Sequence, residues 1–265
     1  MAQLQGKTVV VTGAARGLGR AMAGGLVAAG ANVVGVDLPG QSELEATAKA
    51  LGERFLALGA NITDAAECAR IVETAKGRFG AVHALVNNAG VGQQFINAHF
   101  ASKPTRFWEL TPEQYRNTIE TNATSQFLMA RAVVPSMIAQ KWGRIVNVTT
   151  SFATMLLPGF TPYGPSKASA EALTCIMAKD LAGSGVTANV LIPGGAANTR
   201  MITDLVAFPD ASKLVQPQKM VAPIVWLASN ESNGVTGRRF IAQIWDETLP
   251  PSAAASMASG PVAWA

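Results

Sequence analysis

Thr-Val-Val-Val-Thr-Gly-Ala-Ala-Arg-Gly-Leu-Gly, residues 8–19, is followed by a helical pattern that continues to about residue 29. A short β-branched run that ends in glycines before a helical pattern predicts a buried strand, a tight turn and a helix. Glycine lets the backbone approach a pyrophosphate, and a helix N-terminus supplies free N–H groups and a positive dipole end. This stretch therefore predicts a dinucleotide site at Gly13, Arg16, Gly17, Leu18 and Gly19. The alternative is that the glycines serve only the turn.

Outward from this stretch, apolar runs alternate with helical patterns along the chain. The runs lie at 8–11, 32–36, 55–58, 82–86, 144–148, 186–192 and 240–241, and the helical patterns at 17–29, 42–51, 64–78, 112–140, 163–183 and 217–229. Continuously apolar strands separated by helices are typical of parallel sheets covered on both faces. The sequence predicts a single α/β domain, residues 1–249, with a doubly wound, mostly parallel, seven-stranded Rossmann-like sheet. Residues 250–265, rich in Ala, Ser and Pro, are expected to form a C-terminal tail.

The composition argues against several classes of protein. The 265 residues are 49% hydrophobic and 14% charged, with a formal net charge of +4, and no basic run suggests nucleic-acid binding. The two cysteines and the two histidines, His83 and His99, have no metal-ligand spacing, so no metal is expected. No apolar run of 18 residues predicts a membrane span, and the early first strand leaves no room for a signal peptide. We expect a cytoplasmic protein that acts on a small molecule.

Asp37 ends the second predicted strand, in Val36-Asp37-Leu38. A carboxylate at this position can accept hydrogen bonds from the adenosine ribose and repels the 2′-phosphate of NADP. Arg16 in the turn could instead attract that phosphate. We expect the carboxylate to dominate, so the predicted cofactor is NAD.

Four motifs occur in order at Thr12-Gly13-x3-Gly17-x-Gly19, Asn87-Asn88-Ala89-Gly90, Tyr163-x3-Lys167 and Pro193-Gly194. Together they resemble the motifs of the short-chain dehydrogenases/reductases, and the resemblance covers residues 5 to about 242. It implies an NAD(P)-dependent oxidoreductase acting on CH–OH groups. The cofactor contacts it suggests beyond the glycine turn are Asp37, Ile62, Asp64, Asn88, Gly90, Tyr163, Lys167, Pro193, Gly194 and Thr199. Asp64 could equally cap the next helix, and Asn198 could replace Thr199, because the threonine stands one residue later than usual.

Tyr163 and Lys167 share one face of a predicted helix, since they are four residues apart. Ketone reduction needs a hydride on carbon and a proton on oxygen, and the reverse reaction needs a base for the hydroxyl proton. An unperturbed phenol titrates near 10, which is too high for an efficient base at neutral pH. The Lys167 ammonium would favour the phenolate, so Tyr163 is the candidate general acid/base.

The resemblance implies two further catalytic residues. Counting 13 residues back from Tyr163, where the family usually has serine, reaches Thr150, and Ser151 is its neighbour. Either hydroxyl could bind the substrate oxygen; the alignment favours Thr150, and the other reading is that both cap backbone groups. Asn122 resembles the asparagine that carries a water to the lysine, or it is a buried structural amide.

Apolar residues in three segments are expected to face the substrate. The predicted pocket comprises Phe95, Phe152, Leu157, Phe160 and Met201, which suggests an apolar or aromatic substrate. The same residues could instead pack loops or subunits. The resemblance also implies a homotetramer or dimer, and Trp264 in the tail could anchor to a neighbouring subunit.

Taken together, the sequence predicts an NAD-dependent oxidoreductase that interconverts a secondary alcohol and a ketone. One alternative is an NADPH-dependent 3-oxoacyl-thioester reductase, which Asp37 disfavours. The other is a nucleotide-binding regulator with a silent active site, for which Thr150 in place of serine is the only support.

Overall fold

The strands and helices alternate as the hydrophobic pattern predicts. The structure is a computed structural model that describes residues 3–263. Its strands are β1 (Thr8–Thr12), β2 (Asn32–Asp37), β3 (Phe55–Gly59), β4 (Ala84–Asn87), β5 (Gly143–Val148), β6 (Val186–Ile192), β7 (Arg238–Ile241) and β8 (Ser259–Pro261). The α-helices are α1 (Gly17–Ala28), α2 (Ser42–Leu51), α3 (Ala65–Phe79), α4 (Pro112–Ile119), α5 (Ser125–Ala139), α6 (Phe152–Met155), α7 (Tyr163–Asp180), α8 (Val221–Leu227) and α9 (Pro251–Met257).

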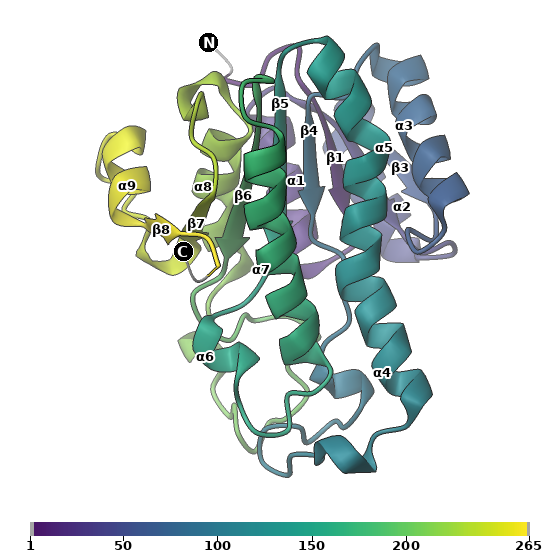
Figure 1. The fold of residues 1–265 in the computed structure, drawn as a ribbon, viewed down its shortest axis with the longest axis vertical. Coiled ribbons are helices and arrows are strands. Elements are labelled where there is room, and N and C mark those ends of the chain that lie inside the picture. The colour runs from purple at the N-terminus through teal and green to yellow at the C-terminus, as the bar shows by residue number, and fades with distance from the viewer. Residues whose placement is uncertain (1–2, 264–265) are drawn as a thin grey trace.

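The strands form one sheet in the order β3-β2-β1-β4-β5-β6-β7-β8 (Figure 1). Strands β1 to β7 are parallel, and β1 pairs with both β2 and β4. The order of the strands therefore changes direction between β1 and β4. In open α/β sheets, ligands bind at the carboxyl ends of the strands at this switch point.

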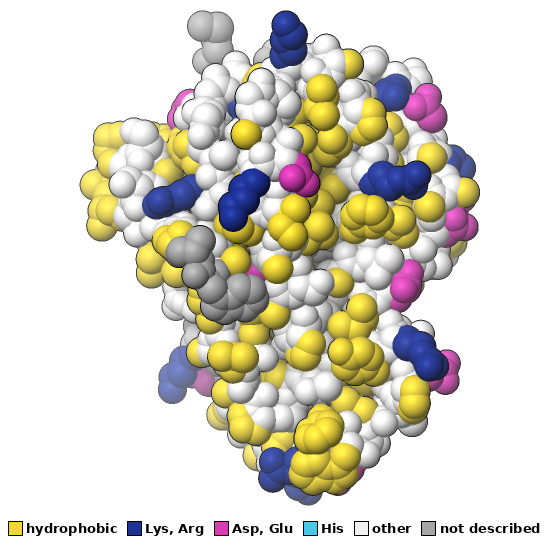
Figure 2. All heavy atoms as spheres, in the orientation of Figure 1, with side chains coloured by type: hydrophobic (Ala, Val, Ile, Leu, Met, Phe, Trp, Pro, Cys, Tyr) yellow, Lys and Arg dark blue, Asp and Glu magenta, His cyan; other side chains and the backbone are white. Residues whose placement is uncertain are grey.

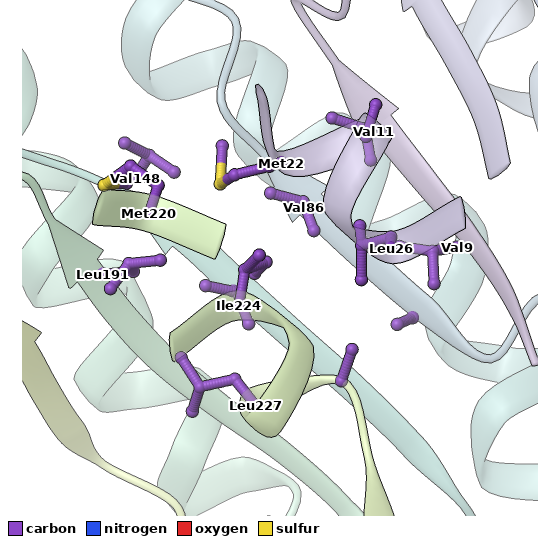
Figure 3. Packing of buried hydrophobic residues seen from close by; sticks show 14 of the residues in the cluster. Val9, Val11, Met22, Leu26, Val86, Val148, Leu191, Met220, Ile224 and Leu227 are labelled. Atoms are coloured by element: carbon purple, nitrogen blue, oxygen red, sulfur yellow. The ribbon is translucent and has the colours of Figure 1, made fainter. Parts of the chain in front are cut away.

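Helices cover both faces of the sheet because successive strand residues point to opposite sides. Val9 and Val11 pack with α1 and α8 on one face, where Met22 and Ile224 are fully buried (Figure 3). Val10 points to the other face and packs with α3 and α5. Each fully buried valine contributes roughly 1.5–3 kcal/mol, so the two apolar layers fix the sheet between the helices.

Within residues 3–263, the sheet has eight strands rather than the expected seven. β8 pairs antiparallel with β7, with Arg239 opposite Gly260. Its three residues, Ser-Gly-Pro, carry no alternating hydrophobic pattern, which explains why the sequence did not indicate a strand. Within the expected tail, residues 251–263 thus contribute α9 and β8, whereas Trp264 lies outside the described residues. The division between a domain at 1–249 and a tail at 250–265 stays a prediction.

The predicted helix at 112–140 is interrupted by a turn of π-helix, η4 (Glu120–Thr124), between α4 and α5. A π-turn inserts one residue into the helical ladder and often marks a functional position. Here it contains Asn122, whose side chain is fully buried.

Between residues 3 and 263, no helix combines the length and apolarity needed to cross a membrane. The same residues contain no group of three or more His, Cys, Asp or Glu side chains arranged to hold a metal ion.

Candidate active site

A cavity of about 1290 Å³ lies at the carboxyl ends of the central strands. Its walls come from the segments that follow each of the strands β1 to β6. Most residues singled out from the sequence line it: Gly13, Arg16, Gly17, Leu18, Asp37, Ile62, Asn88, Gly90, Phe95, Thr150, Leu157, Phe160, Tyr163, Lys167, Pro193, Thr199 and Met201. The fold therefore brings together side chains that are up to about 190 residues apart in sequence.

The glycine-rich turn adopts backbone conformations that side chains disfavour. Gly13 and Gly17 have φ values of +68° and +56°. A Cβ atom on Gly19 would lie 2.0 Å from the Gly13 carbonyl oxygen, so Gly19 lets α1 pack directly against the turn. Asn88 donates to the carbonyls of Thr12 and Gly13 at 3.0 and 3.2 Å, which ties the turn to the end of β4.

The N-terminus of α1 points at this cavity as an anion site would require. Arg16 occupies the N-cap position and makes no side-chain capping bond within the described chain. The first N–H groups of the helix thus remain available, and the helix dipole favours a negative group beside them. The turn, the free N–H groups and the cavity volume fit the pyrophosphate of a dinucleotide.

Carboxylates surround the place where the second strand ends. Asp37 accepts hydrogen bonds from the Ala15 and Leu38 amides at 3.0 and 2.9 Å, which fixes its carboxylate at the cavity wall. Glu43 on α2 contacts Arg16 at 3.7 Å and Arg200 at 2.6 Å. The ion pair of Arg16 with Glu43 joins residues 27 positions apart and appears only in the tertiary structure.

Tyr163 and Thr150 meet in the cavity wall, at the start of α7 and just beyond the end of β5. Burial raises the pKa of Tyr163 to about 12, and the hydrogen bond with the Thr150 side chain lowers it. Lys167 follows one turn along α7, where burial lowers its pKa to about 8. Its Nζ donates to the Val148 carbonyl at 3.0 Å and lies 5.8 Å from the Tyr163 ring centroid.

Ser151 has a different environment from Thr150. Its hydroxyl accepts a hydrogen bond from the Thr154 amide at 3.0 Å and caps α6, and it lies 2.7 Å from the Thr154 hydroxyl. Ser151 does not line the cavity, whereas Thr150 does. Of the two alternatives from the sequence, the structure places Thr150 beside Tyr163 and Ser151 at the helix cap.

Asn122 lies behind the wall and fixes the loop after β4. Its side-chain oxygen accepts from the Val91 amide and its nitrogen donates to the Val91 carbonyl, both at 2.8 Å. The nitrogen also donates to the Ser166 hydroxyl at 3.0 Å. A Cβ on Gly90 would lie 3.0 Å from the Asn122 oxygen and 3.4 Å from the Lys167 amine. Asn122, Gly90 and Lys167 thus converge, although they come from three separate segments.

Three predicted contacts lie elsewhere. Asp64 accepts from the Ala66 amide at 2.8 Å and caps α3, which is the alternative that the sequence left open. Gly194, at φ +101°, packs against Gln243 and Ile241 rather than lining the cavity. Phe152, a predicted substrate-pocket residue, is not among the residues that line the cavity. Its ring lies 4.0 Å from the Arg239 guanidinium because α6 turns this side chain toward β7.

The outer end of the cavity is apolar. Its aromatic and aliphatic lining residues are Phe95, Phe100, Leu157, Phe160, Met201, Ile202 and Phe208. The Phe100 ring packs edge-on against Phe160, with centroids 5.8 Å apart, and tilted against Phe208 at 6.3 Å. Figure 2 shows hydrophobic side chains gathered at this end of the molecule, below the sheet.

Asp204, which no sequence motif indicated, connects two loops that close over this end. The carboxylate is fully buried and accepts from the amides of Ala101 and Ser102 at 3.0 and 2.7 Å and from the Ser102 hydroxyl. Backbone and hydroxyl donors from Ser102, Ala207 and Ala101 hold its pKa near 2 despite the burial. A single acid among apolar residues after the Pro193-Gly194 turn was the available signal, but its partners lie about 100 residues away.

Comparisons with known proteins agree with this geometry. Residues 7–209 match the family described as short chain dehydrogenase. The chain belongs to the short-chain dehydrogenase family. Among its relatives, 3-oxoacyl-(acyl-carrier-protein) reductase FabG of Salmonella typhimurium is 31% identical over 240 residues, covering 88% of this chain and 94% of the relative. The 3-oxoacyl-(acyl-carrier-protein) reductase of Synechocystis is 32% identical over 249 residues, covering 91% and 96%.

A solved structure is similar over nearly the same range. A crystal structure of a proposed gluconate dehydrogenase from Agrobacterium tumefaciens has a TM-score of 0.78 and 30% identity, covering 90% of this chain and 94% of that one. These comparisons confirm the family, the fold class and the general oxidoreductase activity that the sequence predicted. As a short-chain dehydrogenase, the protein is an oxidoreductase that acts on CH–OH or keto groups of a small molecule with a nicotinamide cofactor.

Proposed function

We propose that this short-chain dehydrogenase interconverts a secondary alcohol and a ketone with NAD, on an apolar or aromatic substrate. The observation that carries the proposal is the meeting of Tyr163, Thr150 and Lys167 in one wall of the cavity. A phenol and a hydroxyl side by side can hold one substrate oxygen between them. The nicotinamide ring of the bound cofactor supplies or accepts the hydride.

Each side chain then has a defined task. Thr150 donates to the substrate oxygen and orients the carbonyl, and Tyr163 passes its proton to that oxygen during reduction or takes it during oxidation. The cationic Lys167 lowers the energy of the phenolate, which offsets the effect of burial on Tyr163. Asn122 keeps the Gly90–Val91 loop against Lys167 through its two bonds to Val91.

The preference for NAD rests on two carboxylates rather than one. Asp37 lines the cavity at the end of β2, where we expect the adenosine ribose of a dinucleotide to bind. Glu43 forms ion pairs with the guanidinium groups of Arg16 and Arg200. A 2′-phosphate would meet the Asp37 charge and compete with Glu43 for both arginines. The remaining cofactor contacts proposed are those of the glycine turn with Leu18, Ile62, Asn88, Gly90, Tyr163, Lys167, Pro193 and Thr199. The Asp64 side chain instead caps α3, and Gly194 packs against Gln243 and Ile241.

The first experiment is a fluorescence titration with NADH and with NADPH. We expect NADH to bind at least about tenfold more tightly, because like charges at short range cost more than 1 kcal/mol even near a surface. The double variant Asp37→Ser with Glu43→Gln should reduce or reverse the difference in affinity between NADH and NADPH. Glu45→Gln, on the same helix, is the matched control. NADPH preference in the wild-type protein would contradict the assignment of NAD. Turnover is then followed at the nicotinamide absorbance band across secondary alcohols and ketones.

A 3-oxoacyl-thioester reductase using NADPH is the second candidate, and the names of the relatives favour it. The apolar outer end of the cavity is compatible with an acyl chain as well as with an aromatic substrate. Reduction of a 3-oxoacyl thioester with NADPH at a higher kcat/KM than any simple ketone with NADH would establish this candidate. A binding protein with a silent site would bind NADH and turn over none of these compounds.

Homotetrameric assembly and a cytoplasmic location remain predictions. Exposed Phe127 and Ile138 on α5 and Ile176 on α7 support assembly through these two helices. Cys68 and Cys175 are both free, which fits a reducing compartment.

A further inference from the structure

Two opposite charges are buried directly behind Thr150. Glu171 lies on α7, one turn beyond Lys167, and is fully buried; Arg239 lies on β7 and is 6% exposed. They form an ion pair through Arg239 Nη1 and Glu171 Oε1. Desolvating two charges is costly, and apolar residues of similar volume commonly fill such a place at least as well. The pair therefore suggests a role other than packing.

The contacts of the pair converge on the segment that presents the Thr150 hydroxyl. Arg239 Nη2 donates to the Thr150 carbonyl at 2.5 Å, and the Thr149 hydroxyl donates to Glu171 at 2.5 Å. The Arg239 guanidinium also stacks on the Phe152 ring, 4.0 Å from its centroid. The pair thus touches three of the four residues from 149 to 152.

This segment depends on such contacts because it belongs to neither a strand nor a helix. β5 ends at Val148 and α6 starts at Phe152, so the sheet ladder does not extend to Thr150. Thr150 must nevertheless hold its hydroxyl against Tyr163. Displacement of a reacting group by about 1 Å can cost 10²-fold in rate.

The C-terminal segment completes the arrangement. β8 pairs with β7 beside Arg239, and the chain then turns back so that the Ala263 amide donates to Glu171 Oε2 at 3.2 Å. Figure 1 shows β8 along the edge of the sheet, next to β7 and close to α7. This amide satisfies the carboxylate oxygen that Arg239 leaves free, which a buried carboxylate requires.

We propose that Glu171 and Arg239, held in place by residues 259–263, are positioning residues that set the Thr150 hydroxyl on Tyr163. The inference rests on the proposed function, in which Thr150 and Tyr163 act on the substrate oxygen. Neither charge touches the substrate; both act through the backbone and side chains of residues 149–152. A C-terminal segment thereby contributes to catalysis at a distance.

The test replaces both charges together, as Glu171→Leu with Arg239→Met, because removal of one partner would strand a buried charge. We expect a folded protein that binds NADH like the wild type, with kcat lowered at least about tenfold. The pH at which alcohol oxidation reaches half its maximum should rise, since the Thr150 hydrogen bond lowers the pKa of Tyr163. In a Thr150→Ala background, the same replacement should change kcat less than about twofold.

Lys179→Met is the matched control. Lys179 is an exposed residue of α7, two turns beyond Glu171, and its side chain makes none of the described bonds to residues 149–152 or 259–263. Its replacement should leave kcat and the pH profile within about twofold of the wild type. The inference would be overturned if the paired replacement lowered kcat equally in the wild-type and Thr150→Ala backgrounds. An unchanged kcat in the paired variant would overturn it as well.

Two further measurements keep the test decisive. A chain that ends at Pro261 retains β8 and loses the Ala263 amide, so it should show a smaller loss of kcat with the same dependence on Thr150, even if the paired variant does not fold. Methyl NMR of Thr150 reports its position without turnover. If the wild type reduces no carbonyl compound, the proposed function fails, and an unmoved Thr150 methyl resonance in these variants separately refutes the positioning role.

Discussion

Tyr163 combines a position in the cavity wall with a pKa that its surroundings push in two directions. Burial raises this pKa to about 12, while Thr150 lowers it through a hydrogen bond. Lys167, with a pKa lowered to about 8, stays a cation at neutral pH, when it can favour the phenolate.

Replacement of Tyr163 by Phe removes the proton donor and leaves the ring. We expect kcat to fall by about 10²–10⁴-fold, the usual contribution of a general acid/base. NADH affinity should change little, because the glycine turn and Asp37 are intact. Steady-state kinetics and fluorescence titration check both parts, with Tyr115→Phe as the control on the exposed face of α4. Near-normal turnover of Tyr163→Phe would refute the mechanism.

The pH dependence of alcohol oxidation tests Thr150. Oxidation needs the phenolate, so the rate rises with pH toward the pKa of Tyr163 in the working enzyme. Thr150→Val removes a hydrogen bond that lowers this pKa, so the rising limb should move to higher pH; Thr150→Ser should restore it. The pH–rate profile of kcat/KM measures the shift. A limb that stays in place in Thr150→Val would mean that the hydroxyl does not act on Tyr163.

At the scale of elements, two loops close the outer end of the cavity because Asp204 binds one to the other. Its carboxylate accepts from Ala101 and Ser102, and Thr203 donates to the Ala98 carbonyl at 2.8 Å. Two loops of irregular backbone are otherwise the parts of a domain that open most easily. We therefore expect the hydrogen bonds of Asp204 to keep the two loops closed over the cavity.

Asp204→Ala should remove the hydrogen bonds that join the two loops. Hydrogen bonds to a charged group are each worth about 1.5–3 kcal/mol, so we expect faster hydrogen exchange in residues 97–105 and 199–208 and a KM raised about tenfold or more. Asp210→Ala is the control, since the described contacts of that exposed carboxylate, with Ser212 and with Lys213 at 3.8 Å, all lie within its own turn. Unchanged exchange in Asp204→Ala would show that other contacts hold the loops.

At the scale of the whole molecule, α5 and α7 lie together on one face and expose large apolar side chains. Phe127 and Ile176 are 48% and 55% exposed. Figure 2 shows hydrophobic side chains over this region in the same orientation as Figure 1. Apolar patches of this kind commonly mark interfaces between proteins.

The paired variant Phe127→Asp with Ile176→Asp should weaken self-association by at least about tenfold, because charge is depleted from the core of interfaces. Analytical ultracentrifugation measures the change. Met257→Asp alters an apolar residue on α9 that is more exposed than Phe127 or Ile176, and it should leave the assembly intact. A monomeric wild-type protein, or an unaltered oligomer in the paired variant, would contradict assembly through α5 and α7.

Local pattern alone determined the alternation of strands and helices, the glycine turn and the shared face of Tyr163 and Lys167. These features depend on periodicity and on residues a few positions apart, so short stretches of sequence are enough to predict them. Asp37 at a strand end belongs to the same group, because the carboxyl ends of parallel strands always meet at one edge of the sheet.

Only the tertiary structure shows Thr150 beside Tyr163, Ser151 at the cap of α6, Phe152 against Arg239, and Glu171 paired with Arg239. The Arg239 bonds to Glu171 and to Thr150 span 68 and 89 residues. The sequence did not predict β8 for the same reason. Its three residues form a strand because they pair with β7, and their own sequence carries no strand pattern. Contacts of this kind depend on how packed elements meet in space, which sequence spacing does not record.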